Sequence, residues 1–164
     1  RDGMHLLFNG VCFYSFANTA LAMLNPLQFA ALFLGSGLVG NIVFLVPWSK
    51  ILPRNFQSFQ SRYYSRWYGD LLSTNRLGLG ASGAVNGLIM WTVCTFPRSM
   101  LYIYGIVPVP AVVAGAGIFG YEVYQVLAGS RDLIAHDAHI GGALFGLAYF
   151  LLQNTRRYMR RGII

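Results

Sequence analysis

Five long apolar runs, separated by prolines and polar residues, constrain this chain more than any other feature of its sequence. The runs cover approximately residues 4–24, 27–46, 81–96, 106–127 and 137–153. A helix needs about 20 mostly apolar residues to cross the hydrocarbon layer of a membrane. Only 10% of the residues are charged, against about 25% in a soluble domain, so charge could not cover a water-facing surface. The sequence therefore predicts an all-α, polytopic bundle of transmembrane helices.

The chain is predicted to form a single membrane domain over residues 1–164, because it has no internal repeat and no low-complexity tract. Residues 48–79 mix arginine with phenylalanine, tyrosine and tryptophan, which predicts a long loop at the lipid headgroups. Residues 155–164 form a basic tail. The net charge is +7, and the basic residues lie beside apolar runs. We therefore expect them to contact anionic lipids of the bilayer and not nucleic acid.

Three of the apolar runs carry polar residues close to their amino-terminal ends. The residues are His5 and Asn9 in the first run, Ser82 in the third, and Asp137 and His139 in the fifth. Polar groups inside a membrane are costly and indicate function by default. If the runs alternate in direction, the first, third and fifth all point the same way. The three clusters then lie toward one membrane face, and we infer one shared site.

Glycines in the third and fifth runs predict that these two helices pack closely. Each run has a pair spaced four residues apart: Gly83 with Gly87, and Gly142 with Gly146. Small residues at this spacing allow backbones to approach, which would bring Ser82 near His139. The third run has about 15 residues and rises roughly 22 Å as a helix, so Ser82 should lie below the membrane surface. The backbone of residues 78–80, which ends at Gly80, is then expected to be irregular, and such backbone is tolerated at membrane depth only if it is buried in protein or lines a water-filled cavity.

Ser82 and His139 together offer the two groups that serine hydrolysis requires. A serine hydroxyl is a weak nucleophile and needs a histidine base within hydrogen-bonding reach. Candidate donors for an oxyanion hole are the Asn9 amide, the His5 imidazole and the Ser82 backbone N–H at a helix start. His5 and Asn9 are four residues apart and share one helix face. Taken singly, each residue has an ordinary structural role as a packing or hydrogen-bonding group.

Other ionisable residues are predicted to lie outside the chemistry. His136 and His139 are one helical turn apart, but the zinc-protease pattern H-E-x-x-H requires a different spacing and an intervening glutamate. We therefore expect no metal site. Asp137 lies two residues before His139, on another side of the helix, which favours a Ser–His pair without a third member. Glu122 has no role in this interpretation and is expected near the headgroups on the same face as the site.

Three motifs resemble those of the rhomboid family. "GASG" at residues 80–83 is similar to the G-x-S-G nucleophile motif, and "AHIGGALFG" at residues 138–146 is similar to A-H-x-x-G-x-x-x-G. "HLLFN" at residues 5–9 is similar to the H-x-x-x-N of the second rhomboid helix. Their order and spacing agree across nearly the whole chain. Residues 96–125 resemble the mitochondrial, presenilin-associated branch more than the bacterial one.

The resemblance implies a six-helix core, of which five helices are present and the first is missing. It implies that Ser82 is the nucleophile, that His139 is the base, and that His5, Asn9 and the Ser82 N–H form the oxyanion hole. The implied activity is a serine endopeptidase that cleaves transmembrane segments of other membrane proteins, without metal or cofactor, in the mitochondrial inner membrane. Many rhomboids have a tyrosine four residues after the serine, stacked on the histidine. Asn86 occupies that position here, so the contact is lost or replaced by a hydrogen bond.

Two other classes of function compete with a protease. An inactive rhomboid-like protein would bind membrane clients without cutting them, but it has no need to keep Ser82, His139 and Asn9 together. A transporter or channel would spread polar groups through its helices or break helices in paired halves. In this sequence the polar residues gather at one end of the helices, which favours the protease.

Overall fold

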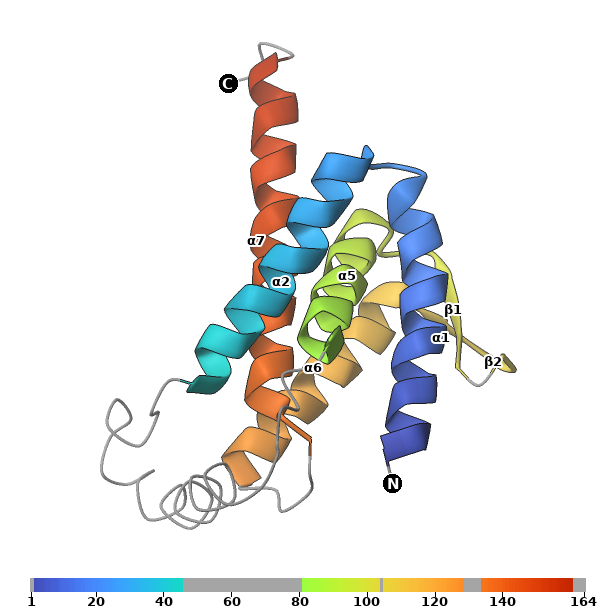
Figure 1. The fold of residues 1–164 in the computed structure, drawn as a ribbon. Coiled ribbons are helices and arrows are strands. Elements are labelled where there is room, and N and C mark those ends of the chain that lie inside the picture. The colour runs from blue at the N-terminus through green and yellow to red at the C-terminus, as the bar shows by residue number, and fades with distance from the viewer. Residues whose placement is uncertain (1, 46–80, 104, 129–133, 161–164) are drawn as a thin grey trace.

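The computed structural model describes residues 2–45, 81–103, 105–128 and 134–160, which form one helical bundle with a small β-hairpin (Figure 1). The helices are α1 (Asp2–Leu21), α2 (Pro26–Leu45), α5 (Ala81–Thr95), α6 (Ala111–Ala128) and α7 (His136–Arg160). The strands are β1 (Met100–Ile103) and β2 (Val107–Pro110). Both α2 and α6 are long and apolar enough to cross a membrane. The predicted membrane-helix fold is confirmed, while the predicted loop at 48–79 and Gly80 lie outside the described residues.

Helix α5 forms the centre of the bundle. It packs against α1, α2, α6 and α7, and most of its residues are buried. Leu88 and Trp91 of α5 meet Leu32 of α2 and Ala20 of α1 in the main apolar cluster. The Trp91 indole donates to the Gln153 side-chain oxygen of α7 at 2.9 Å. The residues of α5 are therefore held from several sides, which fixes the position of its first turn.

The turn between α1 and α2 follows from a capping box. Asn25 Oδ1 accepts a hydrogen bond from the Gln28 backbone N–H, and Gln28 Oε1 accepts one from the Asn25 N–H. Pro26 occupies the first helical position, where its missing N–H costs nothing. This exchange satisfies two N–H groups at the start of α2 and explains why the first two apolar runs separate here.

The fourth apolar run differs from its prediction. We expected a helix over 106–127, but α6 begins only at Ala111, and the preceding residues form β2. Pro108 and Pro110 explain the difference, because proline cannot donate a backbone hydrogen bond and is tolerated in an edge strand. In the antiparallel register Pro108 lies opposite Tyr102 of β1.

The hairpin closes through Gly105 and is tied to α6. Gly105 has a φ of 72°, a conformation that glycine adopts without steric cost. The first N–H groups of α6 bond back to the segment before β1: Ala111 donates to the Ser99 carbonyl at 2.8 Å and Val112 to the Pro97 carbonyl at 3.0 Å. These bonds satisfy donors that a helix start leaves unpaired, so the segment between α5 and β1 acts as the cap of α6.

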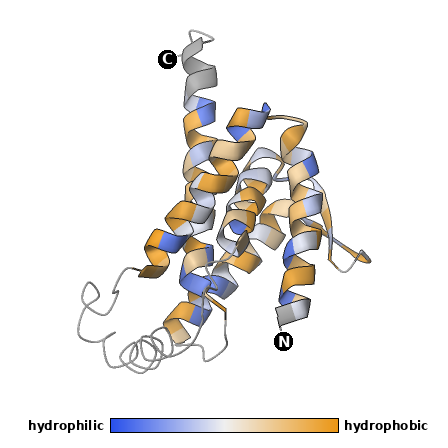
Figure 2. Ribbon diagram, viewed as in Figure 1, coloured by the Kyte–Doolittle hydropathy of each residue, from blue (hydrophilic) through white to orange (hydrophobic). Residues whose placement is uncertain are grey.

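Much of the ribbon in Figure 2 has the colours of hydrophobic residues, and many large apolar side chains are exposed. Large exposed examples on α1, α2 and α6 include Leu6, Phe8, Leu34, Leu38, Val113 and Tyr124. Large apolar patches are rare on the surface of soluble monomers. The helices thus present the kind of surface that lipid chains cover.

Candidate active site

Backbone contact between α5 and α7 brings the amino-terminal ends of both helices together. A methyl group in place of a hydrogen on Gly142 would overlap the Gly83 carbonyl oxygen, and one on Gly146 would overlap the Gly87 carbonyl oxygen. Only glycine at these positions permits the observed approach, as in other small-residue helix contacts.

Helix α2 joins the same contact near the start of α7. A methyl group on Gly40 would lie 2.6 Å from the Ala138 carbonyl oxygen, and one on Gly83 would lie 3.2 Å from the same atom. Ser82 and His139 are the sequence neighbours of Gly83 and Ala138. The predicted nucleophile and base therefore flank one three-helix junction.

Ser82 lies in the first turn of α5 and is 8% exposed. Its carbonyl accepts a hydrogen bond from the Asn86 amide at 3.0 Å. The first N–H groups of a helix have no partner within the helix, and the Ser82 N–H has no hydrogen-bond acceptor among the described residues. Within the described ranges the Ser82 hydroxyl has no hydrogen-bond partner, His139 included.

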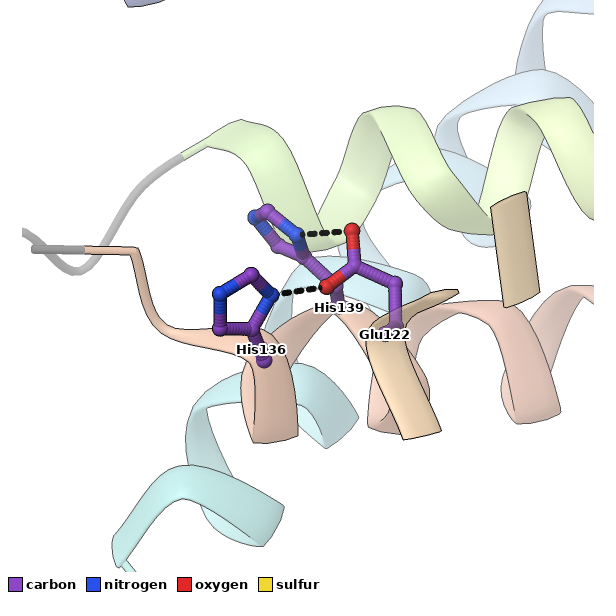
Figure 3. Close-up of side chains that lie close together, drawn as sticks. All are labelled: Glu122, His136 and His139. Carbon is purple, nitrogen blue, oxygen red and sulfur yellow. Dashed lines mark hydrogen bonds and ion pairs between the residues drawn. The ribbon is translucent and has the colours of Figure 1, made fainter. Parts of the chain in front are cut away.

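Glu122 of α6 contacts both histidines at the start of α7 (Figure 3). Its Oε1 lies 2.9 Å from His139 Nδ1, and its Oε2 contacts His136 Nδ1. Glu122 is only 8% exposed, so its carboxylate belongs to the interior of the bundle, and its expected depth near the headgroups stays a prediction. Only positions 129–135 separate α6 from α7, and the end of one helix therefore meets the start of the next.

The ring of His139 has an aromatic neighbour from α1. The imidazoles of His5 and His139 are stacked, with centroids 6.4 Å apart and planes 4° from parallel, within the usual range for ring pairs. Asn86 forms no hydrogen bond to His139, and its amide donates to the Ser82 carbonyl. The contact that many rhomboids obtain from a tyrosine on the serine helix is thus supplied by a different helix.

Asn9 is turned toward its own helix. Its amide nitrogen donates to the His5 carbonyl at 2.8 Å, and the residue is half-buried. An amide nitrogen carries two hydrogens, so one donor remains for another acceptor. Of the predicted pair on α1, the structure brings His5 against His139.

Asp137 has a structural task at the start of α7. Its Oδ1 accepts a hydrogen bond from the Ala138 backbone N–H at 3.0 Å, although the residue is 5% exposed. An acid in the first turn also favours the helix dipole. The described contacts do not join the Asp137 carboxylate to His139, in keeping with its predicted position on another side of the helix.

Sequence reasoning missed the role of Glu122, although a signal was present. A single acid within the apolar run 106–127 marks a group that needs a partner. Helix α6 runs opposite to α1, α5 and α7 (Figure 1). Its carboxyl-terminal half therefore lies at the face where the polar clusters begin.

Comparison with known proteins places the chain in a family. The model of the family described as "Rhomboid domain" matches residues 2–155. The chain belongs to the rhomboid family. This rhomboid chain is 26% identical to RHOMBOID-like protein 12, mitochondrial, of Arabidopsis thaliana, over 85% of the chain and 39% of that protein. It is 29% identical to presenilin-associated rhomboid-like protein A, mitochondrial, of Danio rerio, over 89% of the chain and 33% of that protein.

An uncharacterized mitochondrial rhomboid protein of Schizosaccharomyces pombe is 26% identical, over 97% of the chain and 49% of that protein. The rhomboid chain thus spans between a third and a half of the length of these curated relatives. Their names confirm the predicted mitochondrial, presenilin-associated resemblance and the mitochondrial location. No solved structure matches the chain significantly.

Proposed function

We propose that this rhomboid chain is an intramembrane serine endopeptidase with Ser82 as nucleophile and His139 as base. The observation that carries the proposal is the 2.9 Å contact between His139 Nδ1 and Glu122 Oε1. An ionised carboxylate only accepts hydrogen bonds, so in the neutral imidazole Nδ1 carries the proton and Nε2 keeps its lone pair. A histidine held in this tautomer is ready to take a proton from serine.

The reaction follows the general course of serine hydrolysis. Ser82 Oγ attacks the scissile carbonyl while its proton passes to His139 Nε2, and His139 then protonates the leaving amine. Water then attacks the acyl-enzyme. His139 takes a proton from this water and returns it to Ser82 Oγ as the acyl group leaves. Glu122 stabilises the imidazolium that forms in each step. The hydrogen bond between Ser82 and His139 forms when substrate binds, because catalytic hydrogen bonds often tighten only in the substrate complex.

The oxyanion of the tetrahedral intermediate requires fixed donors. The Ser82 N–H in the first turn of α5 is one such donor. The His5 ring lies against the base, and Asn9 retains one amide hydrogen beyond its bond to the His5 carbonyl. These three groups are proposed to surround the developing negative charge.

The substrates are proposed to be transmembrane segments of other membrane proteins. The site lies among helices whose outer faces are apolar, and a substrate helix reaches such a site sideways from the bilayer. The relatives are named mitochondrial, and the inner mitochondrial membrane is the proposed place of action. The proposed reaction uses side chains and backbone donors of this chain and needs no cofactor.

Labelling with a fluorophosphonate in detergent tests the proposal directly, because the reagent forms a covalent bond only with an activated serine. The wild-type chain should be labelled, whereas Ser82→Ala and His139→Ala should not. Circular dichroism and gel filtration of the same samples control for folding. Labelling of Ser82→Ala equal to that of wild type would remove Ser82 from the role of nucleophile.

An inactive, client-binding rhomboid is the second candidate. The missing hydrogen bond between Ser82 and His139 in the described residues favours it. In that case the folded wild-type chain would stay unlabelled and would still be recovered with intact membrane proteins. The labelling experiment therefore separates the two candidates.

A further inference from the structure

His136 is buried beside the proposed catalytic residues and has no part in the proposed reaction. It is 1% exposed, and its Nδ1 contacts the Glu122 carboxylate. His139 Nδ1 contacts the other oxygen of the same carboxylate. Figure 3 shows both rings turned toward the Glu122 carboxylate, each joined to a different oxygen. One carboxylate thus serves two histidines, although orienting His139 would require only one such contact.

The three side chains match the donor set of a transition-metal site. Glu122, His136 and His139 are all buried, and their candidate ligand atoms lie within 4.8 Å of one another. Two histidines and one glutamate bind Zn²⁺ in many proteins, and water takes the fourth position. Ligand atoms in a tetrahedral zinc site lie about 3.3 Å apart, given bonds of about 2.0 to 2.1 Å. Small side-chain rotations would therefore suffice to admit an ion in place of the shared protons.

Space for the fourth ligand adjoins the cluster. A cavity of about 10 Å³ is lined by Glu122 and His139 together with Asn86 and apolar side chains of α5, α6 and α7. This volume corresponds to about one water molecule. Nitrogen donors favour Zn²⁺ and similar ions over Mg²⁺ or Ca²⁺, which prefer oxygen ligands.

We propose that Glu122, His136 and His139 bind a divalent transition-metal ion, with Zn²⁺ as the best match, and that this ion inhibits the protease. The inhibition rests on the proposed function, whereas the binding does not. An ion bound to His139 Nδ1 replaces the hydrogen bond between His139 and Glu122 and places positive charge beside the ring. The imidazolium that must form when Ser82 attacks is then disfavoured, and hydrolysis stops while the ion is bound.

Binding is tested on the full chain in detergent with the Ser82→Ala variant, because this variant keeps all three ligands and needs no activity. Co²⁺ should bind with the visible absorption of a tetrahedral site, and Zn²⁺ should displace it. Changing an outer partner of a metal ligand costs 10- to 100-fold in affinity, so Glu122→Gln or His136→Asn should weaken binding by at least about 100-fold. Asp137→Asn, a change in a neighbouring buried acid outside the cluster, should bind as the parent does.

Inhibition is tested on the chain with Ser82 intact. Fluorophosphonate labelling should be fastest after treatment with a chelator, should fall when Zn²⁺ is added, and should recover with excess chelator. The His136→Asn variant, compared with its own metal-free rate, should need at least about 100-fold more Zn²⁺ for the same fractional loss.

Several results would overturn the inference. These are no Co²⁺ or Zn²⁺ binding to Ser82→Ala, equal affinity in His136→Asn, or saturating Zn²⁺ without loss of labelling. Zn²⁺-dependent hydrolysis by Ser82→Ala would also overturn it, because the ion would then be a catalyst. A metal-free wild-type chain that is never labelled would contradict the proposed protease, and the Co²⁺ titration would still decide the metal site.

Discussion

His139 Nδ1 lies 2.9 Å from Glu122 Oε1, so an acid on α6 holds the imidazole of a histidine on α7. Ser82 comes from a third helix, α5. The proposed catalytic group is therefore assembled from three helices, with the acid contributed by the helix that runs opposite to the others. A buried carboxylate is costly unless it is hydrogen-bonded, and the two histidines supply that compensation here.

Replacing Glu122 by glutamine distinguishes a catalytic triad that includes Glu122 from a Ser–His pair without it. Glutamine keeps the size of the side chain but loses the charge that stabilises the imidazolium. Loss of the acid in soluble serine proteases costs about 10⁴-fold in rate, and we expect kcat to fall by about 10² to 10⁴-fold with little change in KM. Turnover of a transmembrane substrate measures the effect, and Asp137→Asn is the matched control. Unchanged kcat in Glu122→Gln would leave a Ser–His pair without a third member.

The stacking of His5 on His139 gives a second prediction. His5→Ala removes both the ring and its donor, whereas His5→Phe keeps a ring and removes only the donor. Stacked ring pairs are worth about 0.5 to 1.5 kcal/mol, which corresponds to roughly 2- to 10-fold in rate. We expect both variants to be slower than wild type, and His5→Ala to be slower than His5→Phe by that factor. Equal rates in the two variants would show that the ring does not position His139.

Asn9 provides a test of the oxyanion hole. Its amide already donates to the His5 carbonyl, so only its second hydrogen is available to the substrate. Removing one oxyanion donor typically costs about 10² to 10³-fold in kcat, and we expect Asn9→Ala to lose roughly 10²-fold or more with its thermal stability little changed. Asn18→Ala is a useful control, because Asn18 also donates to a carbonyl four residues earlier in α1. A fully active Asn9→Ala would exclude the residue from the site.

The arrangement of the helices could be predicted from the sequence, because the residues that separate the helices are recognisable locally. Asn25 and Pro26 separate α1 from α2, and glycines of α5 and α7 set the closest helix contact. The start of α6 was predicted too early, because hydropathy does not distinguish a short apolar hairpin from a helix. Pro108 and Pro110 contained the missing information: a helix tolerates proline in its first turn, but an edge strand tolerates it as well.

The candidate site was predictable only where its residues share a helix direction. Ser82, His139 and His5 all lie near the starts of their helices, and the alternation of runs placed them at one face. Glu122 lies in the carboxyl-terminal half of α6, which runs opposite to the helices of the other three residues. The depth at which its side chain meets His139 depends on the short connection between α6 and α7. The partner of the Asn86 amide was also unpredictable, because the sequence does not show whether the amide bonds to a carbonyl of its own helix or to His139.

The contact between α5 and α7 predicts a sharp difference between two glycines. A methyl group on Gly142 would overlap the Gly83 carbonyl, whereas one on Gly120 of α6 meets nothing within 4 Å. Overpacking typically costs about 1 to 3 kcal/mol, so Gly142→Ala should lower the thermal unfolding midpoint in detergent. It should also slow fluorophosphonate labelling, because Ser82 and His139 flank this contact. Gly120→Ala should be as stable as wild type or slightly more so, since alanine favours a helix by about 0.8 to 1.0 kcal/mol over glycine. If Gly142→Ala matched Gly120→Ala in both stability and labelling, the two helices would not meet at this glycine, and the proposed approach of nucleophile and base would lose its support.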